Sequence, residues 1–237
     1  MRVIVVGGGS GGASFAGTLA AAGRHQVLLV EAGPDYGPFA AGGWPDELLR
    51  TQRLADTHDW GLENEDVPGG RRYALGRARV LGGCSSHNGC SAVRGLRSDF
   101  EGWCAASGSD FWRPDALLPD FLAIERALRL RDYPADEIPP FQAAALNAAL
   151  ALGLPPSHDF NDLNAGPAAG LCPVNKVGDT RWNAAFAFLD PVRESGCLEI
   201  LDRAEATDLL LERGRCAGVR VRRPDGEREL TADLVVL

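Results

Sequence analysis

The chain begins with the stretch Arg2-Val3-Ile4-Val5-Val6-Gly7-Gly8-Gly9-Ser10-Gly11-Gly12, which is followed by small residues from Ala13 to Ala22. A β-branched run, a glycine-rich segment and a run of small residues predict a strand, a tight turn and a helix, in that order. Within the turn, Gly7, Gly9 and Gly12 fit the GxGxxG pattern. In this pattern the first glycine makes the turn, the second admits a pyrophosphate, and the third allows the helix to pack closely on the strand. The N–H groups at the start of the helix, around Ser10 and Gly11, are expected to point at the phosphates.

A second buried strand is predicted at residues 26–30, after a helix stop at Gly23. It ends at Glu31, which lies 19 residues after Gly12. A carboxylate at this place accepts hydrogen bonds from the ribose hydroxyls of adenosine and repels a 2′-phosphate. The spacing therefore predicts FAD or NAD as the ligand and excludes NADP. The alternative interpretation is a glycine-rich turn that only joins a strand to a helix.

Composition and charge limit the class of protein. The 237 residues carry 24 Lys and Arg against 32 Asp and Glu, a formal net charge of −8, and 45% of them are hydrophobic. These values are typical of a soluble globular protein, which we expect in the cytoplasm, and the scattered basic residues argue against nucleic acid as a partner.

No stretch approaches the roughly 18 apolar residues that a membrane span needs. Six cysteines without a CxxC pair and four separated histidines indicate neither a disulfide framework nor a metal site.

A second glycine-rich segment lies further along the chain and reads Arg77-Ala78-Arg79-Val80-Leu81-Gly82-Gly83-Cys84-Ser85-Ser86-His87-Asn88-Gly89-Cys90. Its glycines and small polar residues argue against a packed helix. Gly82 and Gly83 let the backbone approach a ligand, and the side chains of Ser85, Ser86 and Asn88 offer hydrogen bonds to a polar ring or a phosphate. The composition therefore predicts a binding loop. An ordinary surface loop is the alternative.

The segment from Arg77 to Gly95 closely resembles the first signature of the glucose-methanol-choline (GMC) family of FAD-dependent oxidoreductases, which is a loop that wraps the flavin. Further segments resemble the family in the same order along the chain, namely Val30–Gly33, Asp59–Gly61, Phe100–Trp103, and Gly178–Arg181 with Ala187–Pro191. The resemblance implies FAD as the cofactor. It also implies an α/β fold, a Rossmann-like FAD-binding region with a parallel sheet, helices and a β meander, joined to the beginning of a substrate or cap domain.

The resemblance and the two glycine-rich segments together give a set of expected cofactor-binding residues. These are Gly7, Gly9, Ser10, Gly11, Gly12, Glu31, Ala32, Arg79, Val80, Gly82, Gly83, Ser85, His87, Asn88, Gly89 and Ala206. The loop around His87 is most similar to the choline oxidase branch, which implies a covalent bond from this histidine to the flavin 8α carbon. The alternative is a histidine that only hydrogen-bonds near the ring, and Cys84 and Cys90 are other nucleophiles in the same loop. Ala206 is implied to contact the adenine through its backbone.

The rest of the pattern predicts helices at 114–130 and 141–152, an irregular connection at 153–173 that can border a substrate cavity, and strands between 198 and 237. We interpret these last strands as an antiparallel meander that returns to the main sheet with residues 234–237. His158, Asp159 and Asn161 are interpreted as solvated loop residues, and a catalytic role for them is the alternative. We expect the flavin core to comprise about 1–40, 73–103 and 196–237, and a cap or substrate-side insertion to comprise about 104–195.

These observations predict the FAD-binding portion of an alcohol oxidoreductase, an oxidase or a dehydrogenase, that transfers a hydride from a CH–OH donor to flavin N5. The expected partners are a small-molecule alcohol and an electron acceptor, oxygen or another, whose identity is not predicted. Because the chain stops where the resemblance implies a further turn, we expect a fragment without the C-terminal substrate domain and the catalytic base, which alone turns over no alcohol. A non-catalytic flavin-binding remnant and an NAD-dependent Rossmann dehydrogenase are the alternatives.

Overall fold

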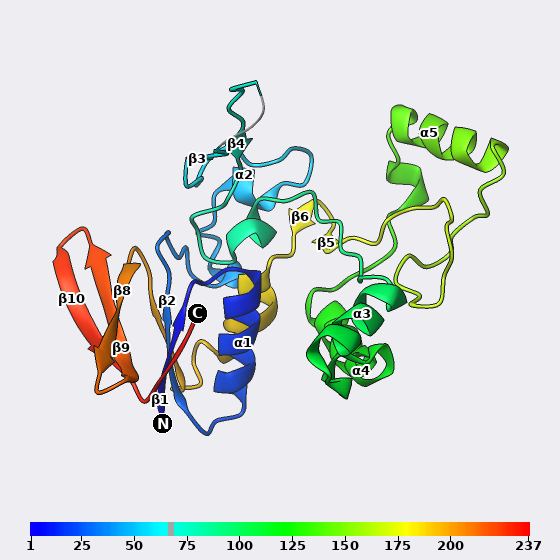
Figure 1. Cartoon of the computed structure of the whole chain (residues 1–237). Coiled ribbons are helices and arrows are strands. Elements are labelled where there is room, and N and C mark those ends of the chain that lie inside the picture. Colours follow the sequence, from blue (N-terminus) through cyan, green and yellow to red (C-terminus); the bar gives the residue numbers. More distant parts are fainter. Residues whose placement is uncertain (66–68) are drawn as a thin grey trace. The chain divides into compact units, whose positions relative to one another are not determined.

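The computed structural model of the chain describes residues 1–65 and 69–237. It divides into two compact units, the first made of residues 1–89 and 178–237 and the second of residues 90–177. Figure 1 shows the chain coloured along its sequence, with the elements labelled as in the text. Each unit is described by itself.

A four-stranded parallel sheet forms the centre of the first unit. Its order is β11-β1-β2-β7, with the bounds β1 (Arg2–Val6), β2 (Gln26–Val30), β7 (Leu198–Leu201) and β11 (Leu234–Val236). Val5 pairs with Leu29 on one side and with Val236 on the other. The apolar runs expected at 3–6, 26–30 and 234–237 therefore form neighbouring strands, as predicted. Both faces of these strands are covered, which is why they are apolar without interruption.

Alternate side chains of the strands point to two different layers. Val3, Val5 and Leu29 pack against helix α1 (Ser10–Ala21), while Ile4 and Leu28 pack against the meander through Val219 and Val221. Figure 1 shows the meander and α1 on opposite sides of β1 and β2. The first unit is thus a layered α/β structure of the predicted class.

Helix α1 is built from small residues because another segment lies directly against it. Its buried positions are Ala13, Ala16, Gly17 and Ala20. A Cβ on Gly17 would lie 2.2 Å from the carbonyl oxygen of Phe188, in the helical turn η5 (Ala185–Leu189). Only glycine allows this approach of the two backbones.

The meander is a separate three-stranded antiparallel sheet with the order β10-β9-β8. Its strands are β8 (Glu205–Glu212), β9 (Arg215–Arg223) and β10 (Gly226–Thr231). The prediction that grouped residues 198–201 with these strands is wrong, because β7 pairs in parallel with β2 at the edge of the main sheet. A short apolar strand gives the same sequence pattern in either sheet.

The remaining elements of the first unit are short. They are η1 (Phe39–Ala41), α2 (Asp46–Leu49), β3 (Leu62–Glu63), β4 (Ala74–Leu75), η2 (Gly83–Ser86), β6 (Thr180–Arg181) and η6 (Asp190–Val192). Thr180 in β6 forms an isolated antiparallel bridge with Arg50, just after α2. This bridge brings Arg181 to the segment that follows α2.

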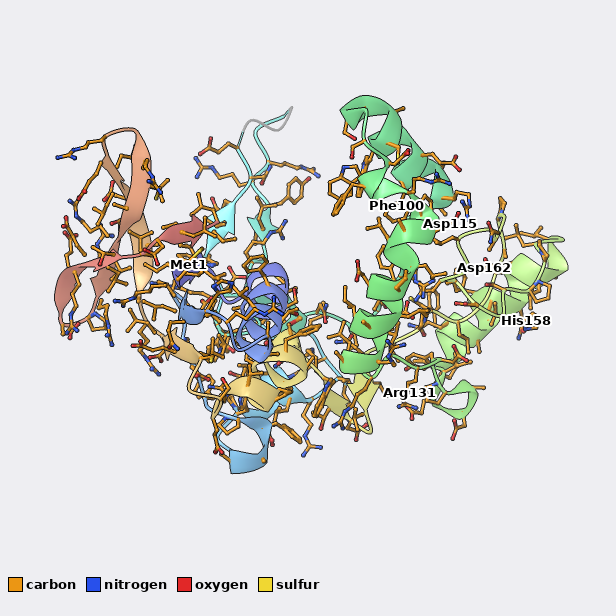
Figure 2. The ribbon with its side chains drawn as sticks, turned by 90° about the horizontal axis from the view of Figure 1, so that it is seen from below. Met1, Phe100, Asp115, Arg131, His158 and Asp162 are labelled. Carbon is orange, nitrogen blue, oxygen red and sulfur yellow. The ribbon has the colours of Figure 1, made fainter. Side chains whose placement is uncertain are left out.

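The second unit is mainly helical. Its elements are α3 (Arg97–Ser107), η3 (Asp110–Trp112), α4 (Pro114–Ala127), η4 (Ala135–Glu137), α5 (Pro140–Ala151) and β5 (Lys176–Val177). Helices α4 and α5 confirm the two predicted helices to within a few residues. Helix α3 packs on α4 through Phe100 and Phe121, whose ring centroids are 5.6 Å apart. Figure 2 labels Phe100 on α3 and His158 and Asp162 on the irregular connection after α5.

One residue of the irregular connection differs from its prediction. His158 and Asp159 are exposed, as expected, but Asn161 is only 5% exposed. Its Oδ1 accepts a hydrogen bond from the Arg94 N–H at 2.8 Å, and Glu125 forms an ion pair with the Arg94 guanidinium. Asn161 therefore belongs to a buried polar network and is not a solvated loop residue.

The unit boundaries differ from the expected insertion at 104–195. Residues 90–103 lie in the second unit, because α3 packs on α4 there. Residues 178–195 lie in the first unit, because η5 packs on α1. The sequence pattern gave no sign of these two long-range contacts. The role of the second unit as a substrate-side cap remains a prediction.

Candidate functional site

The first glycine turn joins β1 to α1 at the carboxyl end of the sheet. Gly7 has a φ of +89° and donates its N–H to the Val30 carbonyl at 2.7 Å, so the turn is fixed to the end of β2. A Cβ on Gly12 would lie 1.9 Å from the Gly7 carbonyl oxygen. Gly7 is therefore required by its backbone conformation and Gly12 by close packing within the turn.

Gly9 differs from these two glycines. It has an ordinary φ of −70°, and a Cβ there would meet nothing nearer than the Gly83 Cα at 4.0 Å. The protein itself therefore leaves room for a side chain at Gly9. Gly9 is also the N-cap residue of α1, which has no side-chain cap and no acidic residue in its first turn. The first N–H groups of α1 can thus receive an anion, as the pyrophosphate of a dinucleotide requires.

Glu31 ties the end of β2 to the turns on either side. Its Oε2 accepts the Gly8 N–H and its Oε1 accepts the Gly33 N–H, each at 2.7 Å, and the residue is only 6% exposed. Burial raises the pKa of Glu31, although the two N–H groups and the charge of Arg79 oppose this. An ionised carboxylate offers about four lone-pair positions, more than the backbone N–H groups occupy, so Glu31 can also accept a ribose hydroxyl. Gly8 and Gly33 were not among the predicted residues, because only the fold reveals their bonds to Glu31.

The second glycine loop lies directly on the first. Gly82 donates its N–H to the Gly8 carbonyl at 2.7 Å, and a Cβ on Gly83 would lie 2.6 Å from the Gly9 Cα. Val80 and Leu81 are fully buried and anchor this loop to the core. The two glycine-rich segments, about 70 residues apart in sequence, thus form one continuous backbone surface. This contact is the main geometric feature of the site.

The polar side chains of the loop take different positions. Ser85 is buried, and its hydroxyl donates to the Gly82 carbonyl at 2.6 Å and accepts the Ala184 N–H at 2.9 Å. Ser85 therefore shapes the loop from within. Asn88 and Gly89 are exposed beyond it.

His87 is half-buried at the end of η2. Its Nε2 hydrogen-bonds to the Thr57 carbonyl oxygen, which can only accept, so Nε2 carries the proton in this arrangement. The lone pair of the neutral ring is then on Nδ1. Of the two cysteines in the segment, Cys84 is exposed and Cys90 is buried.

A hollow of about 520 Å³ lies in the first unit beside the end of β2. Ala32, Gly33, Arg79 and Glu205 are among the residues that line it. The Arg79 guanidinium hydrogen-bonds to Glu205 at 3.2 Å and lies 4.6 Å from the centroid of the Trp60 ring. Ala206 follows Glu205 in β8, just before an irregularity in the pairing with β9. The structure therefore brings Ala32 and Arg79 together at one hollow and places Ala206 next to it in sequence.

The family model described as GMC oxidoreductase matches residues 1–237, which is the whole chain. The chain belongs to the GMC oxidoreductase family. It is 31% identical over 238 residues to the oxygen-dependent choline dehydrogenase of Rhizobium rhizogenes, covering 93% of this chain and 42% of that protein. It is 30% identical over 240 residues to the choline oxidase of Arthrobacter globiformis, covering 92% of this chain and 42% of the oxidase.

Solved structures agree with this assignment. The crystal structure of pyridoxine 4-oxidase from Mesorbium loti matches 99% of this chain and 48% of that chain, with 30% identity and a TM-score of 0.87. The chain thus spans less than half the length of these relatives. Family membership confirms the predicted α/β flavoprotein fold and favours FAD over NAD as the cofactor.

Among residues 1–65 and 69–237, no helix has the length and apolar character needed to cross a membrane. In the same part of the chain, no group of three or more His, Cys, Asp or Glu side chains is arranged to hold a metal ion.

Proposed function

We propose that this chain is the FAD-binding portion of an oxidoreductase that removes a hydride from the CH–OH group of a small alcohol. The contact between the two glycine turns carries the proposal, since it builds a backbone surface at the N-terminus of α1 with open space at Gly9. When bound, the flavin supplies the hydride acceptor, its N5 atom. The chain itself binds and orients the cofactor.

The geometry supports a division of roles within the first unit. The N-terminus of α1, from Gly9 to Gly12, would hold the pyrophosphate, and the free lone pairs of Glu31 would accept the ribose hydroxyls. The hollow beside Arg79 and Glu205 would take the adenine end, next to Ala206. The loop from Gly82 to Gly89 would follow the rest of the cofactor toward the flavin ring.

The substrate class rests on the named relatives, which act on choline or pyridoxine. Both molecules carry a primary alcohol, so a small alcohol is the substrate we propose for the whole protein. The electron acceptor, oxygen or another, remains unspecified, and a cytoplasmic location is the further expectation from composition.

Gly9→Ala tests the cofactor site with a change that the protein alone tolerates. Because a Cβ at Gly9 has room in the protein, we expect Gly9→Ala to keep its far-ultraviolet circular dichroism but to weaken FAD binding at least tenfold, about the loss of one hydrogen bond to a charged group. Fluorescence quenching of FAD measures the binding. Gly102→Ala is the matched control, since a Cβ there meets nothing within 4 Å and Gly102 lies in α3 of the second unit.

Two outcomes would contradict the proposal. One is a wild-type chain that does not bind FAD, and the other is Gly9→Ala that binds it as tightly as Gly102→Ala. At the full length of its relatives, the protein should also lose its flavin absorbance when an alcohol is added without oxygen. If the flavin absorbance persists with every alcohol, the protein is better described as a non-catalytic flavin-binding remnant.

His87 is the residue we propose to bond to the flavin. Replacing a C–H bond at the 8α carbon by a C–N bond releases two electrons and two protons, and the electrons pass through the flavin to its acceptor. With Nε2 donating to the Thr57 carbonyl, Nδ1 has the free lone pair, so a bond through Nε2 requires the ring to leave that carbonyl.

Acid precipitation of the FAD-loaded protein checks the bond. We expect flavin absorbance to stay with the wild-type pellet and to move entirely to the supernatant for His87→Ala. Cys84→Ala, which removes the exposed thiol of the same loop, is the control and should keep the flavin in the pellet. A colourless wild-type pellet would make His87 a hydrogen-bonding neighbour of the flavin only.

A further inference from the structure

A buried arginine contacts the loop of residues 82–89, which we call the flavin loop. It was not among the predicted site residues. Arg181, in β6, is 0% exposed. Its guanidinium donates to four backbone carbonyl oxygens: Nε to Asn88 at 2.8 Å, Nη1 to Leu48 at 2.6 Å and to Ser86 at 3.2 Å, and Nη2 to Arg53 at 3.1 Å. A cation is costly to bury unless its donors are satisfied, and these bonds satisfy most of them.

The four carbonyls belong to two segments that both determine where His87 lies. Ser86 and Asn88 are the neighbours of His87 on either side in the loop. Leu48 and Arg53 belong to the segment of residues 46–58, which carries the Thr57 carbonyl that the His87 ring bonds to. One side chain, that of Arg181, therefore binds the backbone on both sides of His87 and also the segment of residues 46–58 that hydrogen-bonds to the His87 ring.

The supporting segment is braced by side chains of its own. The Thr57 hydroxyl donates to Glu47 Oε1 at 2.6 Å and lies 2.8 Å from His58 Nδ1. His58 Nε2 in turn lies 2.6 Å from the Tyr36 hydroxyl. These bonds fix the Thr57 backbone, so the segment of residues 46–58 can act as a firm base for the His87 ring.

Only a guanidinium suits this position. Its five N–H donors lie in a rigid plane and can reach several carbonyls at once, whereas the three donors of lysine share one nitrogen. A neutral side chain of similar length would leave the carbonyls of Ser86, Asn88 and Leu48 without this donor. Loops whose carbonyls lose their donors rearrange, because a buried unpaired carbonyl costs free energy.

We propose that Arg181 is a positioning residue that fixes His87 in the flavin loop, both its place and the ring nitrogen that carries the proton. The identity of the ligand that His87 faces rests on the proposed function. The fixing of His87 itself is a property of this chain with or without FAD.

The test compares Arg181→Met and Arg181→Lys with the wild-type chain and with Arg131→Met. Arg131 is a matched control, because its Nε also donates to a backbone carbonyl, that of Lys176, within the second unit. The first readout is the ¹⁵N NMR signal pair of the His87 ring without ligand, with His158 as an internal reference. The second is the dissociation constant for FAD.

We expect the wild-type His87 ring to show a protonated Nε2 and an unprotonated Nδ1, and Arg181→Met to show averaged signals while His158 is unchanged. Arg181→Lys should be intermediate, and Arg131→Met should match the wild type. FAD should bind Arg181→Met about tenfold more weakly, the equivalent of one hydrogen bond to a charged group. If Arg181→Met loses secondary structure, Arg181→Lys and Arg181→Ala replace it in the comparison. Added ethylguanidinium should restore the wild-type His87 signals to Arg181→Ala.

Unchanged His87 ring signals in a folded Arg181 variant would overturn the positioning role, whatever the FAD affinity. Wild-type protein that fails to bind FAD would overturn the proposed function instead, and the NMR comparison without ligand would still decide the role of Arg181. The two failures are therefore distinguishable.

Discussion

Glu31 has two tasks at the level of a single residue, and they place opposite demands on its carboxylate. As an acceptor of two backbone N–H groups it fixes Gly8 and Gly33. As the expected partner of ribose hydroxyls it needs to be ionised and accessible, although burial raises its pKa. A ligand whose hydroxyls replace the lost water would relieve the cost of burying the charge.

The raised pKa of Glu31 predicts a pH dependence of stability. The folded chain holds the Glu31 proton more tightly than the unfolded chain, so this contribution is fully present below the ordinary value of 4.5 and is lost as pH rises through the folded pKa. In the ligand-free chain, the free energy of unfolding of the wild type minus that of Glu31→Gln should therefore fall over this range and then level off. The Gln side chain also places its NH₂ group opposite one of the two backbone N–H groups, so one hydrogen bond is lost. This lowers the free energy of unfolding by about 1–3 kcal/mol at every pH.

Urea unfolding at a series of pH values, for both proteins, measures the difference. Using the difference removes the effect of all other carboxylates, which titrate in both chains. A difference that rises with pH would mean that the hydrogen bonds from Gly8 and Gly33 outweigh burial, and that the pKa of Glu31 is lowered.

At the level of elements, the sequence pattern predicted those helices and strands whose formation depends on residues close together in the chain. The β1–α1–β2 unit and its glycine positions followed from residues 3–31, because the strand period and the turn glycines lie within one short stretch. Helix α4 followed from its apolar spacing, and α5 was predicted to begin after the prolines that end at Pro140, whereas the structure includes Pro140 as its first residue.

Elements fixed by distant partners were not predictable in the same way. The apolar run at 198–201 does not reveal whether it pairs with β2 or with the meander. Arg181 and Asn161 are polar residues in loop-like sequence, and only the fold shows that each is buried among carbonyls or charges. The resemblance included Arg181 within a matched segment, but the carbonyls that it binds lie about 90 to 130 residues away in sequence.

At the level of the whole molecule, the predicted cofactor residues all fall in the first unit. All of them lie within residues 1–89 and 178–237, from Gly7 in the first turn to Gly89 in the second loop, together with Ala206. The second unit has a separate set of internal supports, such as the ion pair of Arg94 with Glu125. FAD binding energy should therefore be distributed unevenly over the chain.

We expect FAD to slow amide hydrogen exchange in the first unit and to leave helix α5 of the second unit unchanged. At a free FAD concentration one hundred times its dissociation constant, binding stabilises the folded first unit by about 2.7 kcal/mol, which should raise the melting temperature of that unit by a few degrees. The slowing should be strongest at residues 7–13 and 80–89, because their N–H groups and turns form the surface that we propose binds the cofactor. Mass spectrometry of peptides from the exchanged chain measures it, with Gly9→Ala at the same FAD concentration as the control in which the slowing should be clearly smaller. Equal slowing in α5 and in the glycine turns would show that FAD stabilises the chain as a whole and would contradict this prediction.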